Sequence, residues 1–312
     1  MKEPLTPAKL ALISMIFGLL LVSALFAGCT QSTNSTPVTT AATTAPVTVA
    51  ATPVATAVPT TVVTTATPAP VYTATQGNLV AYTAASLSGV SKTLGSSFTN
   101  AYPGHSVAFN LDGTQALKTQ VENGAYADVF ISASNSYTNT LKSENYFVND
   151  SVKTLTTNYV IVIVPASNPG NIQSLADLAK PGKKIAMAAG TVPVGTATMA
   201  VINNSAKSTY GQAWKDSVIS NVVTYETSEP AVATKVSLGE VDAGFVYQST
   251  ATAAASGTYK TVTIGKADNY LQTYTIAIMK ESTNKAVAAE FEQFMLSSAG
   301  QQILAQYGFT SP

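Results

Sequence analysis

The candidate ligand-binding residues in this sequence are mostly small, uncharged hydrogen-bond donors. They lie where predicted strands end and predicted helices begin. The first two joints are Ala84-Ala85-Ser86-Leu87 and Asp112-Gly113-Thr114. A third runs through residues 189–196 and is rich in Gly and Thr, and a fourth is Thr227-Ser228-Glu229-Pro230. A helix start carries unpaired N–H groups and about half a positive charge. Several helix starts that face one cleft would bind an oxyanion without any cation.

The same residues also have an ordinary structural interpretation. Ser and Thr are common N-caps, and Pro is common at the first helical position. For any single joint, capping explains the sequence better than ligand contact does. Composition and spacing alone therefore reach no further than an exported α/β domain with two lobes.

Charge and composition exclude several classes of function. The 312 residues include 16 Lys and no Arg, balanced by 16 acidic residues, so nothing favours a nucleic-acid partner. The chain has one His, His105, and one Cys, Cys29, which leaves no zinc cluster and no intrachain disulfide. It has neither a G-x-S-x-G nor a P-loop motif. We therefore predict a protein that is not an enzyme and needs no cofactor.

The first 77 residues predict export and a stalk. Lys2 and Lys9 precede an apolar run that ends in Ala27-Gly28-Cys29, so residues 1–28 are interpreted as a signal peptide with a lipobox. Cys29 is then the lipidated residue, which would anchor the protein at the outer face of the cytoplasmic membrane. An uncleaved N-terminal anchor helix is the alternative. Residues 29–77 are rich in Thr, Ala and Pro and predict a disordered stalk.

From residue 78 onward, strand and helix patterns alternate. Continuous apolar runs such as YVIVIVP at 159–165 predict buried strands, and amphipathic segments between the runs predict helices. Repeated β-α units imply mostly parallel sheets flanked by helices. We take the apolar strands at 159–165 and 274–279 as crossings between two lobes. The first lobe would hold residues 78–160 and 275–312, and the second would hold residues 161–274.

Residues 78–312 resemble the molybdate-binding proteins of ABC importers, members of the periplasmic binding protein superfamily. The resemblance implies a two-lobe type II fold with a ligand cleft between the lobes, and a monomer that delivers its ion to an ABC permease and ATPase. The stretches that carry it run in family order: AASL (84–87), ALKTQVENGAYADVFISAS (116–134), IVIVPASNP (161–169), SLADLAKPGKKIAM (174–187), VPVG (192–195), GEVDAGFVYQSTA (239–251) and SSAGQQILAQYGF (297–309).

The resemblance also implies which residues hold the oxyanion. Ser86 would contribute its hydroxyl and amide, and Thr114 lies where the family has a Ser before its second helix. Val194 and Glu229 would each contribute a backbone N–H, and Tyr247 its phenol O–H. The bound ligand would be molybdate or tungstate, held through its oxygens with no direct metal ligand.

Three acidic residues bear on that assignment. Asp112 would repel a dianion if it faced the site, so we favour a local turn in which it points away. Asp128 is interpreted as a structural residue near the hinge. An archaeal branch of the family uses Glu and Asp carboxylates as additional metal ligands, and the Glu229 carboxylate is the candidate here. Val192 stands near the position of that Asp, so binding by hydrogen bonds is favoured.

Three alternatives stay open at this stage. The ligand would be another tetrahedral oxyanion, phosphate or sulfate; an Asp112 or Glu229 that faced inward would accept the proton of a protonated oxyanion such as phosphate. A catalytic role has no motif to support it. A stalked adhesion protein would have the same signal peptide and stalk but no small ligand.

Overall fold

The computed structural model describes residues 77–312. The predicted signal peptide, Cys29 and the stalk as far as residue 76 lie outside the described residues. Among residues 77–312, no helix combines the length and the apolar character that a membrane crossing needs.

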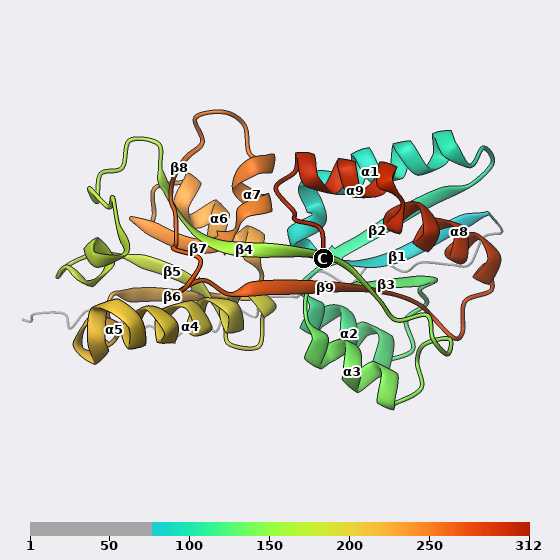
Figure 1. The fold of residues 1–312 in the computed structure, drawn as a ribbon, viewed down its shortest axis with the longest axis horizontal. Coiled ribbons are helices and arrows are strands. Elements are labelled where there is room, and N and C mark those ends of the chain that lie inside the picture. The colour runs from blue at the N-terminus through green and yellow to red at the C-terminus, as the bar shows by residue number, and fades with distance from the viewer. Residues whose placement is uncertain (1–76) are drawn as a thin grey trace, which may run out of the picture. The chain divides into compact units, whose positions relative to one another are not determined.

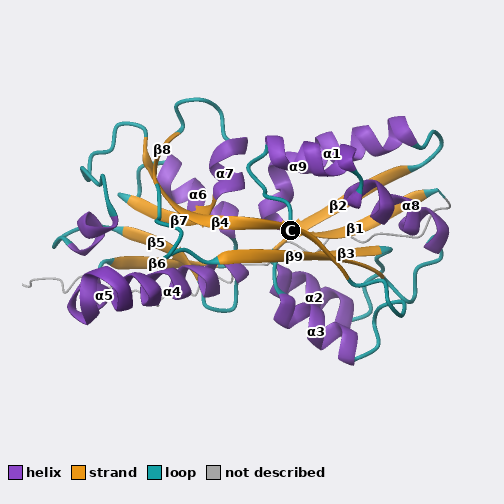
Figure 2. Cartoon of the chain, viewed as in Figure 1, coloured by secondary structure: helices purple, strands orange, loops and turns teal. Residues whose placement is uncertain are grey.

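Strands and helices alternate along the described chain, as Figures 1 and 2 show. The strands are β1 Asn78–Ala84, β2 Ser106–Asp112, β3 Val129–Ser132, β4 Lys153–Pro165, β5 Ile185–Ala188, β6 Val222–Glu226, β7 Ala243–Tyr247, β8 Tyr259–Val262 and β9 Leu271–Ile278. The α-helices are α1 Ser88–Ala101, α2 Thr114–Glu122, α3 Asn135–Ser143, α4 Pro193–Ser205, α5 Gly211–Ser220, α6 Glu229–Ser237, α7 Gln248–Ala253, α8 Lys285–Leu296 and α9 Ser298–Gln306. Short 3₁₀ turns η2 Ala85–Leu87 and η3 Leu175–Ala179, and a π-helical turn η4 Ala206–Tyr210, complete the set.

The strands form one mixed sheet in the order β2-β1-β3-β9-β4-β7-β5-β6, with β8 beside β4. We call β1, β2 and β3 the first half of the sheet and β5, β6 and β7 the second half. Within each half the pairs are parallel, as β-α units predict. The pairs that involve β4, β8 and β9 are antiparallel.

Strands β4 and β9 join the two halves. β4 pairs with β9 as far as Tyr159, opposite Leu271, and from Val160 it pairs with β7, starting opposite Tyr247. The segment Val160–Pro165 is buried throughout apart from small residual exposure, because helices cover both faces of the sheet here. β4 therefore joins the two halves through one continuous strand.

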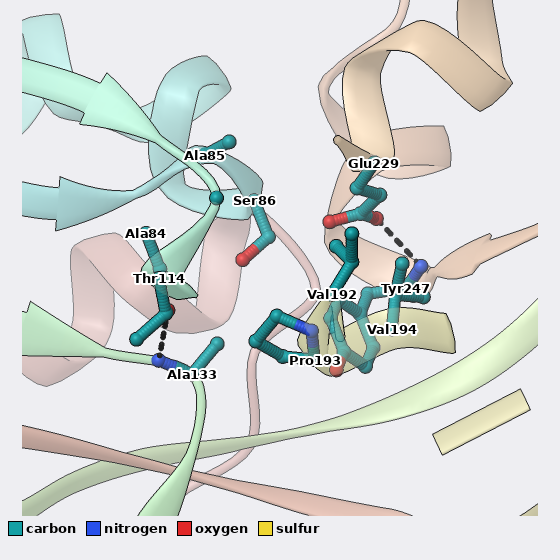
Figure 3. Close-up of a pocket in the computed structure, with 11 residues that line it drawn as sticks. Ala84, Ala85, Ser86, Thr114, Ala133, Val192, Pro193, Val194, Glu229 and Tyr247 are labelled. Atoms are coloured by element: carbon teal, nitrogen blue, oxygen red, sulfur yellow. Dashed lines mark hydrogen bonds between the residues drawn. The ribbon is translucent and has the colours of Figure 1, made fainter. Parts of the chain in front are cut away.

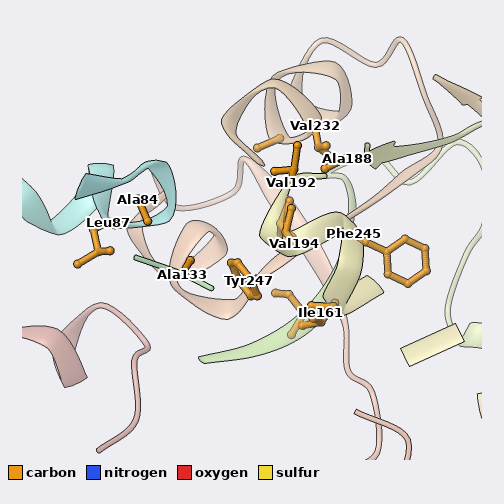
Figure 4. Close-up of a cluster of buried hydrophobic side chains, with 14 of the residues drawn as sticks. Ala84, Leu87, Ala133, Ile161, Ala188, Val192, Val194, Val232, Phe245 and Tyr247 are labelled. Carbon is orange, nitrogen blue, oxygen red and sulfur yellow. The ribbon is translucent and has the colours of Figure 1, made fainter. Parts of the chain in front are cut away.

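Helices cover both faces of each half (Figure 2). In the first half, α1, α8 and α9 lie on one face, and α2 and α3 lie on the other. In the second half, α6 and α7 lie on one face, and α4 and α5 lie on the opposite one. One buried apolar cluster runs through both halves and includes Leu87, Ile161, Val194 and Tyr247, which Figure 4 labels.

The predicted strands and helices of residues 78–312 are confirmed, with a few shifted ends. The main omission is the stretch Lys153–Asn158, which forms the first part of β4 and pairs with β9. Its threonines resemble a polar loop in sequence, but Thr is β-branched and favours a strand once a neighbouring strand is present. The short segment Leu175–Ala179 forms a 3₁₀ turn and not an α-helix.

Candidate functional site

A small cavity of about 10 Å³ lies between the two halves of the sheet. This volume is enough for about one water molecule. A tetrahedral anion with four oxygens is larger, so its entry requires the two walls to move apart. The lining residues are Ala84, Ala85, Ser86, Gly113, Thr114, Ala133, Val192, Pro193, Val194, Glu229 and Tyr247, drawn in Figure 3.

The cavity is built at the carboxyl ends of six strands. β1, β2 and β3 deliver residues 84–86, 113–114 and 133 from the first half. β5, β6 and β7 deliver residues 192–194, 229 and 247 from the second half. This is the edge at which open α/β sheets bind ligands. All five residues that the sequence singled out, Ser86, Thr114, Val194, Glu229 and Tyr247, line this one cavity.

Helix starts form much of the lining, and their N–H groups lack side-chain caps. α2 begins at Thr114, α4 at Pro193 and α6 at Glu229, and none of these starts has a side-chain cap hydrogen bond. Away from the cavity, Ser134 caps α3 and Ser297 caps α9. The first N–H groups of α2, α4 and α6 therefore remain available to a ligand. The predicted side-chain capping is absent at these three starts, whereas the expected Pro stands in the first turn of α4 and α6.

The Ser86 hydroxyl is held by a buried tyrosine. Ser86 Oγ lies 2.8 Å from the hydroxyl of Tyr274, which belongs to β9. The Asn158 amide also bonds the Tyr274 hydroxyl, and it donates to Ser249 Oγ at 2.8 Å. Since the Tyr274 hydroxyl accepts from Asn158, its single proton is best used toward Ser86. If the Tyr274 hydroxyl is the donor of this bond, Ser86 accepts it and keeps its own O–H for a ligand in the cavity.

The Thr114 hydroxyl is arranged in the same way. Thr114 Oγ1 accepts from the backbone N–H of Ala133 at 3.1 Å. A hydroxyl that accepts one hydrogen bond still has its own proton to donate. Thr114 is 1% exposed, so the cavity is the place where that proton finds an acceptor.

Gly195 allows α4 to approach the end of β5. A Cβ at this position would stand 2.1 Å from the carbonyl oxygen of Ala189 and 2.6 Å from that of Ala188. Both contacts are with backbone, which cannot move aside easily. The glycine therefore fixes how closely Val194 and its N–H reach the cavity.

Glu229 is the acidic residue of the lining and is 3% exposed. Its Oε1 accepts from the backbone N–H of Tyr247 and from the hydroxyl of Thr250, both at 2.7 Å. Its Oε2 is buried and has no hydrogen-bond partner among residues 77–312. Burial raises the pKa of this carboxyl from 4.5 to about 7, although the two donors act in the opposite direction.

Tyr247 contributes through a buried ring at the end of β7. Its hydroxyl donates to Gln272 Oε1 at 3.2 Å. Burial raises the pKa of this phenol well above 10, so the hydroxyl stays a donor over the physiological range. Binding of an anion by this O–H would require it to leave Gln272, and its predicted role remains a prediction.

Besides the buried bond from the Ser249 hydroxyl on α7 to the carbonyl of Ser86 at 3.3 Å, two hydrogen bonds cross from one half to the other near the cavity. The Gln115 side-chain amide, on α2, donates to the carbonyl of Thr227 at 3.0 Å. The Tyr137 hydroxyl, on α3, donates to the carbonyl of Thr191 at 2.6 Å. Both bonds are exposed and would break when the walls separate.

The other acidic residues singled out in the sequence lie outside the lining. Asp112 Oδ1 accepts from the N–H of Gly113 at 2.7 Å, a local turn as expected. Asp128 is fully buried and accepts from Val80 N–H at 2.8 Å and from the Ser282 hydroxyl at 2.6 Å. Its structural role is confirmed, but the hinge position is wrong, since it fastens β1 to the loop before α8.

The sequence-based analysis missed the residues that orient the donors. Tyr274, Asn158, Ser249 and Thr250 touch site residues without lining the cavity. Thr250 follows Tyr247 by three residues at the start of α7, which was a usable signal. Tyr274 lies on a strand that looks purely structural in sequence, and Asn158 lies in a stretch that resembles a loop. No group of three or more His, Cys, Asp or Glu in residues 77–312 is placed to hold a metal ion.

Comparisons with known proteins agree with this geometry. A family described as bacterial extracellular solute-binding protein matches residues 79–310. The chain is 32% identical over 240 residues to the molybdate-binding protein ModA of Mycobacterium tuberculosis, covering 76% of this chain and 87% of that protein.

Solved structures share the fold at lower identity. The periplasmic molybdate-binding protein of Azotobacter vinelandii aligns with a TM-score of 0.65 at 21% identity, over 75% of this chain and 99% of that one. The sulfate-binding protein SubI of Mycobacterium tuberculosis aligns with a TM-score of 0.66 at 19% identity, over 75% and 86%. The predicted α/β fold of periplasmic binding proteins is thereby confirmed, and the fold alone does not select the anion.

Proposed function

The chain belongs to the bacterial extracellular solute-binding protein family, and from this premise we propose that it captures molybdate or tungstate in the cavity between the two halves of its sheet. Proteins of this family are the extracytoplasmic, non-enzymatic binding components of ABC transporters. The protein is therefore a transport component and not an enzyme. The identity of the bound ion is our proposal.

The observation that carries the proposal is the convergence of uncapped helix starts and free hydroxyl protons on one buried cavity. The lining contains no Lys, so the negative charge would be balanced by amides, helix dipoles and the hydroxyls of Ser86 and Thr114. A hydrogen bond to a charged group contributes about 1.5–3 kcal/mol. A few such bonds from both walls are sufficient for tight binding of a small dianion.

Selection among anions would come from size. A tetrahedral oxyanion satisfies donors on both walls only when its oxygens reach both, so an ion of the wrong size leaves some buried donors unpaired. Unpaired buried donors cost about 1–3 kcal/mol each. The relatives named as molybdate-binding support this ion over the smaller sulfate.

Phosphate is the second candidate, and one observation favours it. Glu229 Oε2 is buried without a partner, and as a carboxylate it would accept a proton from a monohydrogen oxyanion. Sulfate carries no such proton at neutral pH and would meet the same carboxylate as a repulsion.

A melting-temperature series decides between these ions. The purified protein, freed of bound anions, is heated with sodium molybdate, tungstate, sulfate or phosphate at equal concentration. A ligand that binds only the folded state raises the melting temperature, and at equal concentration the tighter ligand raises it more. We expect the largest rise with molybdate or tungstate, and none for these two in Ser86→Ala at low ligand. If phosphate or sulfate alone raises the melting temperature, the proposed ion is wrong.

Anchoring and delivery complete the proposal. We infer that Cys29 carries the lipid, that the stalk holds a monomeric binding domain away from the membrane, and that an ABC permease with its ATPase receives the ion. Cys29→Ala then releases the protein from the membrane fraction into the medium. Retention of this variant in the membrane would point instead to an uncleaved N-terminal anchor.

A further inference from the structure

Glu229 presents its two carboxyl oxygens to different surroundings. Both of its hydrogen-bond donors, the Tyr247 N–H and the Thr250 hydroxyl, act on Oε1. Oε2 has no partner among the residues that the structure describes, and it is buried. In Figure 3 this oxygen points across the cavity toward Ser86, whereas the other oxygen bonds to Tyr247. The Glu229 side chain thus faces the cavity with Oε2, the oxygen that has no hydrogen-bond partner among the described residues.

A neutral carboxylic acid fits this arrangement. Its carbonyl oxygen accepts two hydrogen bonds, as Oε1 does, and its O–H needs one acceptor, which Oε2 lacks. An ionised carboxylate would leave Oε2 as a buried, uncompensated negative charge facing a bound anion. An oxygen of an oxyanion is the acceptor that a protonated Oε2 requires.

The surroundings of Glu229 offer no cation that would hold it ionised. α6 packs against β4, β5, β6, β7 and η2, and Thr250 of α7 reaches it as well. β5, η2 and α7 carry no titratable side chain. The titratable groups on the other elements are Lys153 and Tyr159 of β4, Tyr225 and Glu226 of β6, Tyr247 of β7 and Tyr274 of the adjacent β9, with Lys235 on α6 itself.

The charged groups among these are engaged elsewhere. Lys235 pairs with Glu240 at 2.6 Å, and Lys153 pairs with Glu292. Glu226 accepts from the Thr224 hydroxyl at 2.6 Å. Asp112, at the end of β2, accepts from Gly113 and lies outside the lining. Burial, which raises the pKa of Glu229 to about 7, therefore acts without an opposing positive charge.

We propose that Glu229 binds the oxyanion as a proton donor, with Oε1 fixed by Tyr247 and Thr250 and a proton on Oε2 directed to an oxygen of the anion. This inference rests on the proposed function, because it takes the cavity to be the anion site. Above neutral pH the empty protein holds Glu229 ionised, and binding then takes up one proton from solvent. Anion and proton enter together, so affinity depends on pH.

Calorimetry of molybdate binding between pH 5.5 and 8.5 tests this. For the wild-type protein we expect constant affinity below pH 7 and a loss of about tenfold per pH unit well above it, because one proton is bound with each ion. Measurements at pH 8.5 in two buffers with different heats of ionisation report the number of protons taken up, which should be one.

Glu229→Gln is the decisive variant. A glutamine keeps an oxygen for Tyr247 and Thr250 and places an NH₂ donor where the protonated Oε2 stood. We expect it to bind with the low-pH affinity of the wild type at every pH, within about threefold, and to take up no proton. Loss of binding in this variant, with binding intact in the wild type, would mean that the carboxylate itself is the ligand or accepts a proton from the anion, and would overturn the inference.

Thr250→Val supplies a second, independent readout away from the cavity lining. It removes a donor that favours the ionised form, so the pH at which affinity begins to fall should move upward, while Thr250→Ser should keep the wild-type profile. An unchanged profile in Thr250→Val would count against the assignment of the proton to Glu229. If the wild-type protein binds no tetrahedral oxyanion at any pH, the proposed function itself fails, which is a different result.

Discussion

The buried Glu229 carboxyl makes the stability of the empty protein depend on pH in an unusual direction. The unfolded chain releases this proton near pH 4.5, whereas the folded protein keeps it up to about pH 7. Between these values the folded state binds more protons than the unfolded state. The free energy of unfolding therefore falls as the pH rises from 4.5 through 7, and the contribution is fully lost above that.

The size of this effect follows from the two pKa values. A rise from 4.5 to about 7 corresponds to about 3 kcal/mol between pH 4 and pH 8, since each pKa unit is worth about 1.4 kcal/mol. Other groups titrate over the same range, so the wild type alone does not isolate Glu229. The quantity to compare is the difference in unfolding free energy between pH 5 and pH 8 in the wild type and in Glu229→Gln.

Urea denaturation in buffers free of phosphate and sulfate measures the unfolding free energy of each protein at pH 5 and at pH 8. Glu229→Gln should lose less stability from pH 5 to pH 8 than the wild type does, by up to about 3 kcal/mol. Glu226→Gln, which alters a partly exposed carboxylate three residues earlier, should behave like the wild type. If Glu229→Gln and the wild type lose the same stability, Glu229 does not titrate with a raised pKa and the reasoning about its burial is refuted.

Three further predictions concern the cavity walls. Tyr274→Phe removes the group that orients the Ser86 hydroxyl and should weaken molybdate binding about tenfold by calorimetry, with an unchanged circular dichroism spectrum; equal affinity would remove Tyr274 from the site. Tyr137→Phe deletes a bond between the halves and should raise the ion's dissociation rate severalfold in stopped-flow measurements, with little change in the association rate. Gly195→Ala should displace the start of α4 and lower both melting temperature and affinity; a wild-type affinity would show that α4 has room to move.

The sequence was sufficient for the elements and for the residues that line the cavity. Apolar runs and helical periodicity located β1, β5 and β7, the small residues after β1 drew attention to Ser86, and the family resemblance implied Val194 and Tyr247. These are local properties, since a strand end and a helix start are adjacent in the chain. The resemblance to a known family then selected among many possible helix starts.

The orienting contacts were beyond the reach of sequence alone. Tyr274 and Ser86 are 188 residues apart, and Asn158 lies in the part of β4 that resembles a loop. Whether Glu229 contributes its backbone amide or its carboxyl depends on how Tyr247 and Thr250 orient the carboxyl group. Residue spacing does not determine that orientation. Long-range side-chain geometry arises only when β4 and β9 bring the two halves together.

The unbroken course of β4 and β9 constrains how the protein admits and releases its ion. A single flexible loop would let the walls swing about one point, but paired strands keep their ladder bonds and deform by twisting over several residues. The register irregularity between Thr154 and Thr156 lies in this paired stretch, where a bulge increases local twist. If the walls separate to admit the proposed anion, a torsion of these strands would allow it while the ladder bonds between β4 and β9 are kept.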